Sequence, residues 1–271
     1  MEFLSVKEAA AKWGISERRV RALCESGRIE GATRCGDWVW SIPAGTVRPA
    51  DGRTLRYMKN RNLRTGSQDY RAVDALRKSA NIVTLTHEEK ALIIEDALAF
   101  DNINLSDVKI KKILNHENTG DDLSVQIAVL NLYSLLSKLG FETSEKSLKA
   151  VNERLNLSID EKNAGLYRLD KNQAEEAEAL FCQYAGPWSI LHPVARAAFL
   201  FSEIIRIEMF RSLNAQTAFV MLENEFIKAK LPPVVFGKDN MGQLKAALVS
   251  SQMRGNSQTL VSMILEAVEG K

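Results

Sequence analysis

The chain has 271 residues, of which 45% are hydrophobic and 26% charged, and its formal net charge is +2. This composition is typical of a folded globular protein and excludes wholesale disorder, a collagen-like fibre and a disulfide-knit miniprotein. No apolar run reaches the roughly 18–20 residues that a membrane span needs, and the opening MEFLSVKEAA does not read as a signal peptide. With only three cysteines, Cys24, Cys35 and Cys182, we expect a reducing, cytoplasmic location and no membrane partner.

The charge is unevenly distributed along the chain. Residues 1–80 hold 16 Lys and Arg against 9 Asp and Glu, a net charge of +7, whereas residues 81–271 hold 20 against 25, a net charge of −5. A basic N-terminal part on an acidic remainder indicates a part that faces nucleic acid. Ordinary variation of surface charge is the alternative.

The basic part opens with the signals of two short helices. Ser5 is positioned to cap the first helix, and Glu8, three residues later, completes a capping box. Gly14 is expected to end that helix in the left-handed conformation. Ser16 caps a second helix, SERRVRALCESG, which ends near Gly27.

The second helix is amphipathic, with basic side chains on its solvent-facing side. Spacing places Val20, Leu23 and Cys24 toward the core, so that Arg18, Arg19 and Arg21 face solvent near the start of the helix. Two helices joined by a tight turn, with basic side chains at the N-terminal part of the second, are the layout of a helix-turn-helix.

The stretch ATRCGDWVWSIP alternates around Cys35-Gly36-Asp37, which predicts a β-hairpin. Trp38, Trp40 and Ile42 share one face of its second strand, and Arg34 lies beside the turn. Together with SVKEAAAKWGISERRVRALCESGRI, this hairpin resembles the winged helix-turn-helix of MerR-type regulators and excisionase-like modules. The resemblance implies binding to double-stranded DNA. The candidate DNA-binding residues are Lys7, Ser16, Arg18, Arg19, Arg21 and Arg34; the alternative is a solvated basic face on a protein-binding domain.

The remaining chain predicts a linker and then a helical domain. We expect a winged helix-turn-helix at residues 1–50, a basic linker at 51–82 and an all-α domain at 83–271, so the fold class is mainly α. The run PVARAAFLFSEIIRIEMF is apolar over most of its surface, which predicts a buried central helix beginning at His192-Pro193.

The helical domain resembles the Fic (filamentation-induced-by-cAMP) family. The resemblance rests on LHPVARAAFLFSEIIRIEMFRSLNAQTAFVMLENEFIKAKLPPVVF, which aligns without gaps with a buried helix, the motif H-P-F-x-D/E-G-N-G-R-x-x-R and a helix ending near P-P-V. AGLYR at 164–168 is similar to the segment before the family's flap. The resemblance implies an enzyme that transfers the nucleotide of ATP to a protein hydroxyl.

The aligned motif positions have lost most of the polar groups that this chemistry needs. Glu208 stands where the family has its histidine base, and Ser212 stands where it has the acidic magnesium ligand. Gln216 and Phe219 replace the two arginines, and only Asn214 remains of the catalytic set. The aligned residues are Glu208, Met209, Phe210, Ser212, Leu213, Asn214, Ala215, Gln216 and Phe219. We therefore predict no catalytic residue, no metal and no cofactor.

Two further departures agree with this interpretation. Only about three residues, 169–171, separate Arg168 from the next predicted helix, so the flap that aligns a target is expected to be missing. By the resemblance, Asp101 is the counterpart of the family's inhibitory glutamate. That glutamate clamps the second arginine of the motif, and Phe219 replaces this arginine here. We interpret Glu208 as pairing with an arginine such as Arg206 or Arg211 at the helix end.

We expect a DNA-binding transcriptional regulator whose Fic-like domain serves dimerisation, partner binding or ligand binding, with a homodimer as the favoured form. A divergent nucleotidyltransferase that uses Glu208 or His192 is one alternative, although His192 is interpreted as a helix-start residue. An antitoxin-like interaction protein with a protein partner is another alternative.

Overall fold

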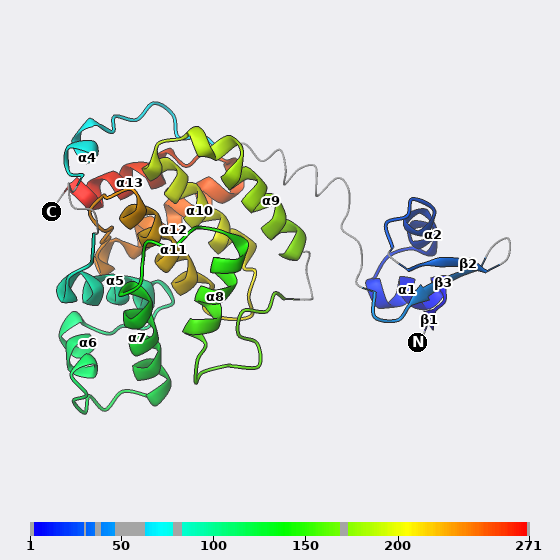
Figure 1. Ribbon diagram of the computed structural model, residues 1–271, viewed down its shortest axis with the longest axis horizontal. Coiled ribbons are helices and arrows are strands. Elements are labelled where there is room, and N and C mark those ends of the chain that lie inside the picture. Colours follow the sequence, from blue (N-terminus) through cyan, green and yellow to red (C-terminus); the bar gives the residue numbers. More distant parts are fainter. Residues whose placement is uncertain are drawn as a thin grey trace. The chain divides into compact units, whose positions relative to one another are not determined.

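The computed structural model describes residues 3–29, 31–35, 39–46, 63–77, 83–168 and 173–269. The chain divides into two compact units, Met1–Arg56 and Tyr57–Lys271, called here the N-terminal unit and the body (Figure 1). Each unit has a hydrophobic core of its own.

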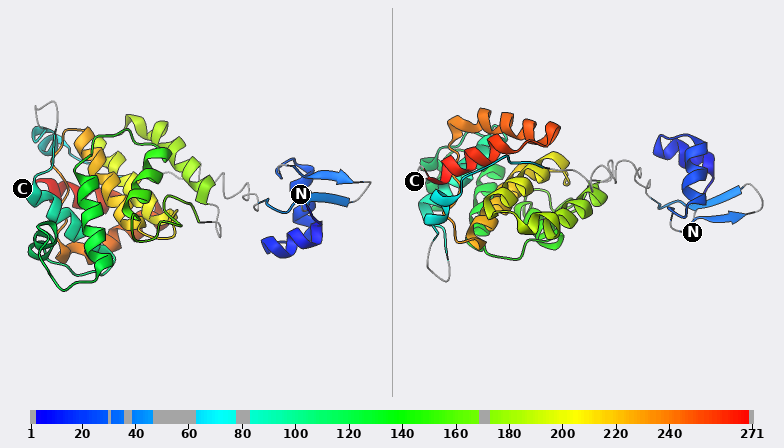
Figure 2. Two further views of the ribbon diagram at one scale, coloured as in Figure 1. Left: turned by 60° about the horizontal axis from the view of Figure 1, so that its bottom comes forward. Right: turned by 90° about the horizontal axis from the view of Figure 1, so that it is seen from above.

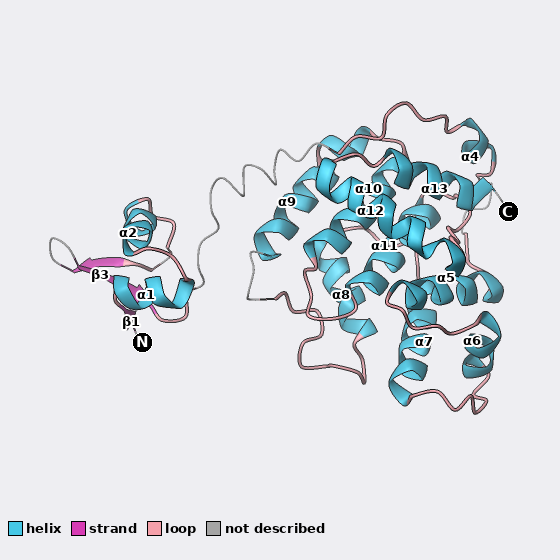
Figure 3. Cartoon of the chain, turned by 180° about the vertical axis from the view of Figure 1, so that it is seen from behind, coloured by secondary structure: helices cyan, strands magenta, loops and turns pink. Residues whose placement is uncertain are grey.

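The N-terminal unit holds the predicted pair of helices and the predicted hairpin. Ser5 forms the capping box with Glu8, and Gly14 ends the first helix with φ 63°, as expected. The strands, drawn in magenta in Figure 3, form an antiparallel sheet in the order β1-β3-β2. Its elements are β1 (Phe3–Leu4), α1 (Val6–Trp13), α2 (Glu17–Glu25), β2 (Thr33–Cys35) and β3 (Val39–Pro43).

The core of the N-terminal unit lies between the helices and the sheet. Val20, Leu23 and Cys24 are buried, which confirms the predicted inner face of α2, and Ile42 of β3 is fully buried against them. Strand β1 was not predicted, because two residues are too short to show an alternating pattern. The hairpin turn with Trp38 lies outside the described residues.

Every regular element described in the body is a helix. None of the helices in the described ranges is long and apolar enough to cross a membrane. The elements are α4 (Arg71–Ala75), α5 (His87–Phe100), α6 (Asp107–Leu114), α7 (Leu123–Leu136), α8 (Glu145–Leu155), α9 (Gln173–Ala185), η1 (Pro187–Ile190), α10 (Pro193–Ile207), α11 (Asn214–Lys228), η2 (Lys238–Asn240), α12 (Met241–Arg254) and α13 (Gln258–Glu269).

Helices α10 and α11 form the centre of the body (Figure 2). Most side chains of α10 are buried, as predicted, and nearly all those of α11 are buried too. His192 caps α10, and Pro193 takes its first position, where the missing N–H costs nothing. Around this pair, α9, α12 and α13 pack on α10, while α5, α7 and α8 pack on α11.

Part of the expected linker is packed on the body. Leu63 and Val73 are buried in the core, and the backbone of Arg64 bonds with Gly255 and Ser257, at 2.8 Å each. Burial of these two apolar side chains lowers the free energy of the folded protein, and this holds the segment on the body. Residues 47–62, which include the rest of the basic segment up to Arg61, lie outside the described residues.

Candidate functional site

The loop between α10 and α11 holds the residues that align with the Fic motif, and two left-handed residues shape it. Glu208 ends α10 with φ 49°, and Leu213 precedes α11 with φ 59°. A side chain in this conformation costs roughly 1 kcal/mol, which glycine would avoid. Asn214 closes the loop: its Oδ1 accepts from the Phe210 N–H at 2.9 Å, and its Nδ2 donates to the Phe210 carbonyl at 2.8 Å.

A network of hydrogen bonds between neutral groups holds this loop on α8 and its C-terminal end. The Nδ2 of Asn152 donates to the Ser212 carbonyl at 3.0 Å and to Thr217 Oγ1 at 3.2 Å. Ser212 Oγ donates to Asn156 Oδ1 at 3.0 Å, and the Gly165 N–H donates to Asn152 Oδ1 at 3.1 Å. Asn152, Asn156 and Thr217 are buried. The carbonyl and the hydroxyl of Ser212 are therefore both engaged, by the amides of Asn152 on α8 and of Asn156 directly after it.

The segment before residue 169 pairs with the loop. Tyr167 forms an antiparallel bridge with Phe210, and the Arg168 N–H donates to the Met209 carbonyl at 2.9 Å. Met209 and Phe210 are fully buried. This pairing places Arg168 Nη1 3.7 Å from Glu208 Oε2.

Glu208 therefore pairs with an arginine, as the sequence interpretation expected, but with Arg168 rather than with Arg206 or Arg211, the two that it suggested. The left-handed turn at Glu208 directs the chain away from α10, toward the bridged segment. Arg206 instead binds Glu203 at 2.8 Å and Glu176 at 2.7 Å. The short segment 169–171, where a flap would be inserted, lies outside the described residues.

The two positions that align with the motif's arginines make unlike contacts. Gln216 Nε2 donates to Asp101 Oδ2 at 2.8 Å, so the two residues that the sequence resemblance likens to the family's first arginine and inhibitory glutamate are in contact. Phe219 is buried, and its ring meets Phe201 edge-on at 5.1 Å and Phe100 at 5.9 Å between centroids. The hydrogen bond from Gln216 to Asp101 was missed in sequence, because 115 positions separate the two residues.

His192 lies at the opposite end of α10 from Glu208, and 15 helical residues between them span about 22 Å. Its Nδ1 accepts from the Val194 N–H at 3.3 Å, which confirms its interpretation as a helix-start residue. Its ring stacks on Tyr70 at 3.9 Å, and its Nε2 lies 3.1 Å from Asp74 Oδ1. Hydrogen bonds from His192 and then Arg77 hold the pKa of the Asp74 carboxyl below its usual range.

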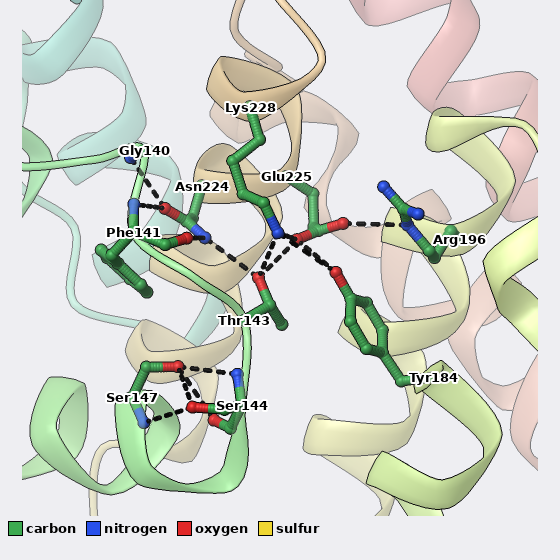
Figure 4. A network of polar contacts seen from close by, with 10 residues as sticks. All are labelled: Gly140, Phe141, Thr143, Ser144, Ser147, Tyr184, Arg196, Asn224, Glu225 and Lys228. Atoms are coloured by element: carbon green, nitrogen blue, oxygen red, sulfur yellow. Dashed lines mark hydrogen bonds and ion pairs between the residues drawn. The ribbon is translucent and has the colours of Figure 1, made fainter. Parts of the chain in front are cut away.

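A charged cluster surrounds the fully buried Glu225 at the C-terminal end of α11 (Figure 4). Its Oε1 accepts from Thr143 Oγ1 at 2.5 Å, from the Tyr184 hydroxyl at 2.8 Å and from Lys228 Nζ at 3.0 Å. Its Oε2 accepts from Arg196 Nε at 3.1 Å.

The electrostatics of this cluster favour the charged carboxylate. Burial raises the pKa of Glu225, but the Thr143 and Tyr184 hydrogen bonds and the Lys228 charge outweigh burial, so the pKa lies below 4.5. The cluster was missed in sequence. The spacing of Glu225 and Lys228 by three positions on one helix was its only local signal.

The candidate DNA-binding residues lie on the surface of the N-terminal unit. Ser16 caps α2 by accepting from the Arg19 N–H at 3.3 Å, which sets Arg18 and Arg19 in the first turn of the helix. Arg21 pairs with Glu17 at 2.9 Å, and both side chains are about half exposed, at 47% and 46%. All the candidates are exposed: Lys7, Ser16, Arg18, Arg19, Arg21 and Arg34.

Among the residues described, no group of three or more His, Cys, Asp or Glu side chains is arranged to hold a metal ion. No family model and no curated protein matches the chain. Solved structures do. A fragment of Fic-1 from C. elegans, residues 134–508, is 17% identical with a TM-score of 0.61, over 80% of this chain and 68% of that chain.

Two bacterial structures agree with this match. A Fic family protein from Desulfovibrio desulfuricans G20 is 14% identical with a TM-score of 0.59, over 68% of this chain and 63% of that chain. A Fic domain containing signaling protein from Bacteroides thetaiotaomicron is 14% identical with a TM-score of 0.55, over 80% and 90%. The chain has the Fic fold over most of its length. At these identities the likeness establishes the Fic fold but not an activity, which has to be argued from the residues of the site.

Proposed function

We propose that this protein is a DNA-binding transcriptional regulator whose Fic-fold body does not transfer nucleotides. The observation that carries the proposal is the exposure of Arg18, Arg19 and Arg21 at the start of α2. The N-terminal part of the second helix is where a helix-turn-helix presents side chains to base edges.

The N-terminal unit supports this proposal as a winged helix-turn-helix. Helix α1 packs on α2, and the hairpin β2–β3 follows as the wing. In this arrangement α2 enters the major groove, while Arg34 on β2 and Lys7 on α1 contact phosphates. Ser16 has a structural part as well, since its hydroxyl caps α2 and fixes the direction of Arg18 and Arg19.

The loop between α10 and α11 supports the absence of nucleotide transfer. Base catalysis near neutral pH favours an imidazole, and position 208 carries an exposed carboxylate paired with Arg168. Charge on a triphosphate requires cations, but Gln216 is neutral and binds the Asp101 carboxylate. Ser212, which has no carboxylate to offer a magnesium ion, donates its hydroxyl to Asn156.

Selection of bound sequences from a random duplex pool tests the DNA-binding proposal. We expect enrichment of a two-part site whose half-sites are about one helical turn apart, or a multiple of it. The variant with Arg18, Arg19 and Arg21 changed to alanine should enrich no site. A matched control, with the exposed body residues Lys112, Lys146 and Lys162 changed to alanine, removes the same charge and should enrich the same site as the wild type. Absence of enrichment by the wild type contradicts the proposal.

The rival activity is tested separately with labelled ATP, magnesium and a cell lysate. The proposal predicts no transfer of label to protein. Transfer that disappears on the change Glu208→Ala would assign the body a nucleotidyltransferase activity and overturn the second half of the proposal.

A further inference from the structure

The body has a cavity of about 400 Å³ at its surface. The residues that line it lie on α5, α12, α13 and the segment between α11 and α12, so the cavity is separate from the loop between α10 and α11. Helix α12 packs against both α5 and α13 around it. A volume of this size is within the range of sites that bind small molecules.

Apolar side chains form the inner wall of the cavity. Phe236, on the segment before α12, is 5% exposed. The other apolar members of the wall are half-buried; they are Leu92, Val235, Met263 and Ala267. The apolar area that these side chains leave in contact with water would be covered by the apolar part of a ligand, which lowers the free energy of the complex.

Two buried carboxylates fix the segment that carries part of this wall. Asp96 Oδ2 on α5 accepts from the N–H groups of Phe236 and Gly237, at 2.7 and 3.2 Å. Glu223 on α11 accepts from the Val234 N–H at 3.1 Å. Because the backbone of the segment is held in this way, the cavity is formed before a ligand binds, and binding requires little further ordering of the chain.

The polar side chains at the mouth of the cavity offer hydrogen-bond acceptors. Among the described lining residues, Glu266 on α13 is the only one that carries a charge, and its side chain is exposed. Asn240 Nδ2 donates to the Phe236 carbonyl at 2.7 Å, which commits the amide nitrogen to the wall and leaves the amide oxygen as an acceptor. A carboxylate and an amide oxygen together favour a ligand that is positively charged and donates hydrogen bonds.

Other charges near the mouth have the same sign. Glu269 follows Glu266 by three positions on α13, and Asp239 directly precedes Asn240; both are exposed. The neighbouring Lys238 is paired with Glu95 on α5, at 3.5 Å. The surroundings of the cavity therefore attract cations and repel anions.

We propose that this cavity binds an organic ammonium ion with an apolar body of one or two rings. The apolar body covers the wall, and the ammonium group lies at the mouth, where it donates to Glu266 and to Asn240. The site goes beyond the proposed function and depends on the body alone. Because solvent screens the exposed Glu266, the affinity is modest, with a Kd of about 10–500 µM.

Equilibrium dialysis of the full chain without DNA tests the site with three probes that share one ring system. The probes are the cation naphthylmethylammonium, the neutral naphthylmethanol and the anion naphthylacetate. The wild type should bind the ammonium with the stated Kd. It should bind the alcohol about 3–5-fold more weakly, because the attraction of Glu266 is lost, and the acetate more weakly still.

Three substitutions locate the bound probe. Glu266→Gln keeps the shape of the side chain and removes its charge, so it should raise the Kd of the ammonium about 3–5-fold and leave that of the alcohol unchanged. Glu178→Gln, on an exposed side chain of α9, is the matched control and should change neither. Ala267→Phe fills the cavity and should abolish the binding of both. Equal melting temperatures establish that the variants fold.

Four outcomes contradict the proposal. A wild type that retains no ammonium at about 2 mM probe, or retention that Ala267→Phe leaves unchanged, overturns the site. Equal affinities for the ammonium and the alcohol, or an ammonium Kd that Glu266→Gln leaves unchanged, overturn the assignment of an ammonium ligand.

Discussion

The ion pair of Arg21 in the N-terminal unit and the ion pairs of Arg196 and Arg206 in the core of the body differ in burial. In the N-terminal unit, Arg21 and its partner Glu17 are both about half exposed. In the body, Arg196 and Arg206 have side chains only 22% exposed, and their partners Glu225 and Glu203 are buried. An exposed ion pair contributes about 0–1 kcal/mol and is readily exchanged for a phosphate. A buried pair cannot be broken at this cost.

Under the proposed function, this difference lets one chain join a basic surface to a Fic fold that does not transfer nucleotides. Cations that are committed to buried carboxylates stabilise the helical core and are not presented to a triphosphate. Arg168, whose backbone bonds to the loop between α10 and α11, pairs with Glu208. The arginines of α2, by contrast, line an exposed helix surface.

The largest effect on stability is expected at the buried Glu225. Glu225→Ala leaves Arg196 and Lys228 without their shared carboxylate inside the protein, so the free energy of unfolding should fall by about 3–5 kcal/mol. Urea denaturation of the full chain measures it. Glu208→Ala, which removes a carboxylate whose side chain is 55% exposed, is the control and should cost at most about 0.5 kcal/mol. Equal losses would remove the distinction between the two carboxylates.

The network of neutral side chains that supports the loop between α10 and α11 should give the next largest effect on stability. Asn152→Ala leaves the Ser212 carbonyl and the Gly165 N–H without a buried partner. The expected loss in the free energy of unfolding is about 1–3 kcal/mol, since each unsatisfied buried group costs its desolvation. Asn163→Ala, on a side chain that binds only the neighbouring Asp160, should cost less. A change at Asn152 within about 0.3 kcal/mol would show that the network does not support the loop.

The pH dependence of stability follows from Glu225. Its pKa is lowered in the folded state, so its contribution is complete above 4.5 and is lost as the pH falls through the lower folded value. A difference of one between the folded and unfolded pKa values corresponds to about 1.4 kcal/mol in the free energy of unfolding. Urea midpoints of wild type and Glu225→Gln, measured between pH 7 and pH 3, should converge as the pH falls. A constant difference across that range contradicts the assignment.

The smallest effect on stability is expected at the exposed pair of Arg21 and Glu17. Arg21→Ala removes the ion pair with Glu17, and the free energy of unfolding should change by about 0.5 kcal/mol or less. Thermal melting of the full chain gives the value. A loss above about 1.5 kcal/mol would mean that Arg21 holds the N-terminal unit together rather than serving its surface.

Sequence and structure agree best where a signal is local. The caps at Ser5 and Ser16, the left-handed Gly14 and the buried α10 all depend on residues within a few positions of one another. The pairs Arg168–Glu208 and Asp101–Gln216 join residues 40 and 115 positions apart. No spacing rule predicts such contacts, because the fold of the body brings the residues together.

The packing of residues 63–77 was missed for a related reason. Tyr70 stacks on His192, and Val73 is buried, but the apolar run around Val73 is too short to show a helical period in sequence. A basic composition indicates a linker, whereas two or three well-placed apolar side chains are enough to hold a short segment on a core.

The most direct measurement of the central claim is the affinity for a selected duplex, followed by fluorescence polarisation at several salt concentrations. The account predicts salt-sensitive binding by the wild type. Changing Arg18, Arg19 and Arg21 to alanine should weaken it about 100-fold and remove its preference over a scrambled duplex. The control with Lys112, Lys146 and Lys162 changed to alanine should bind like the wild type. Equal weakening of the two triple variants, or an unchanged preference in the arginine variant, would contradict the account.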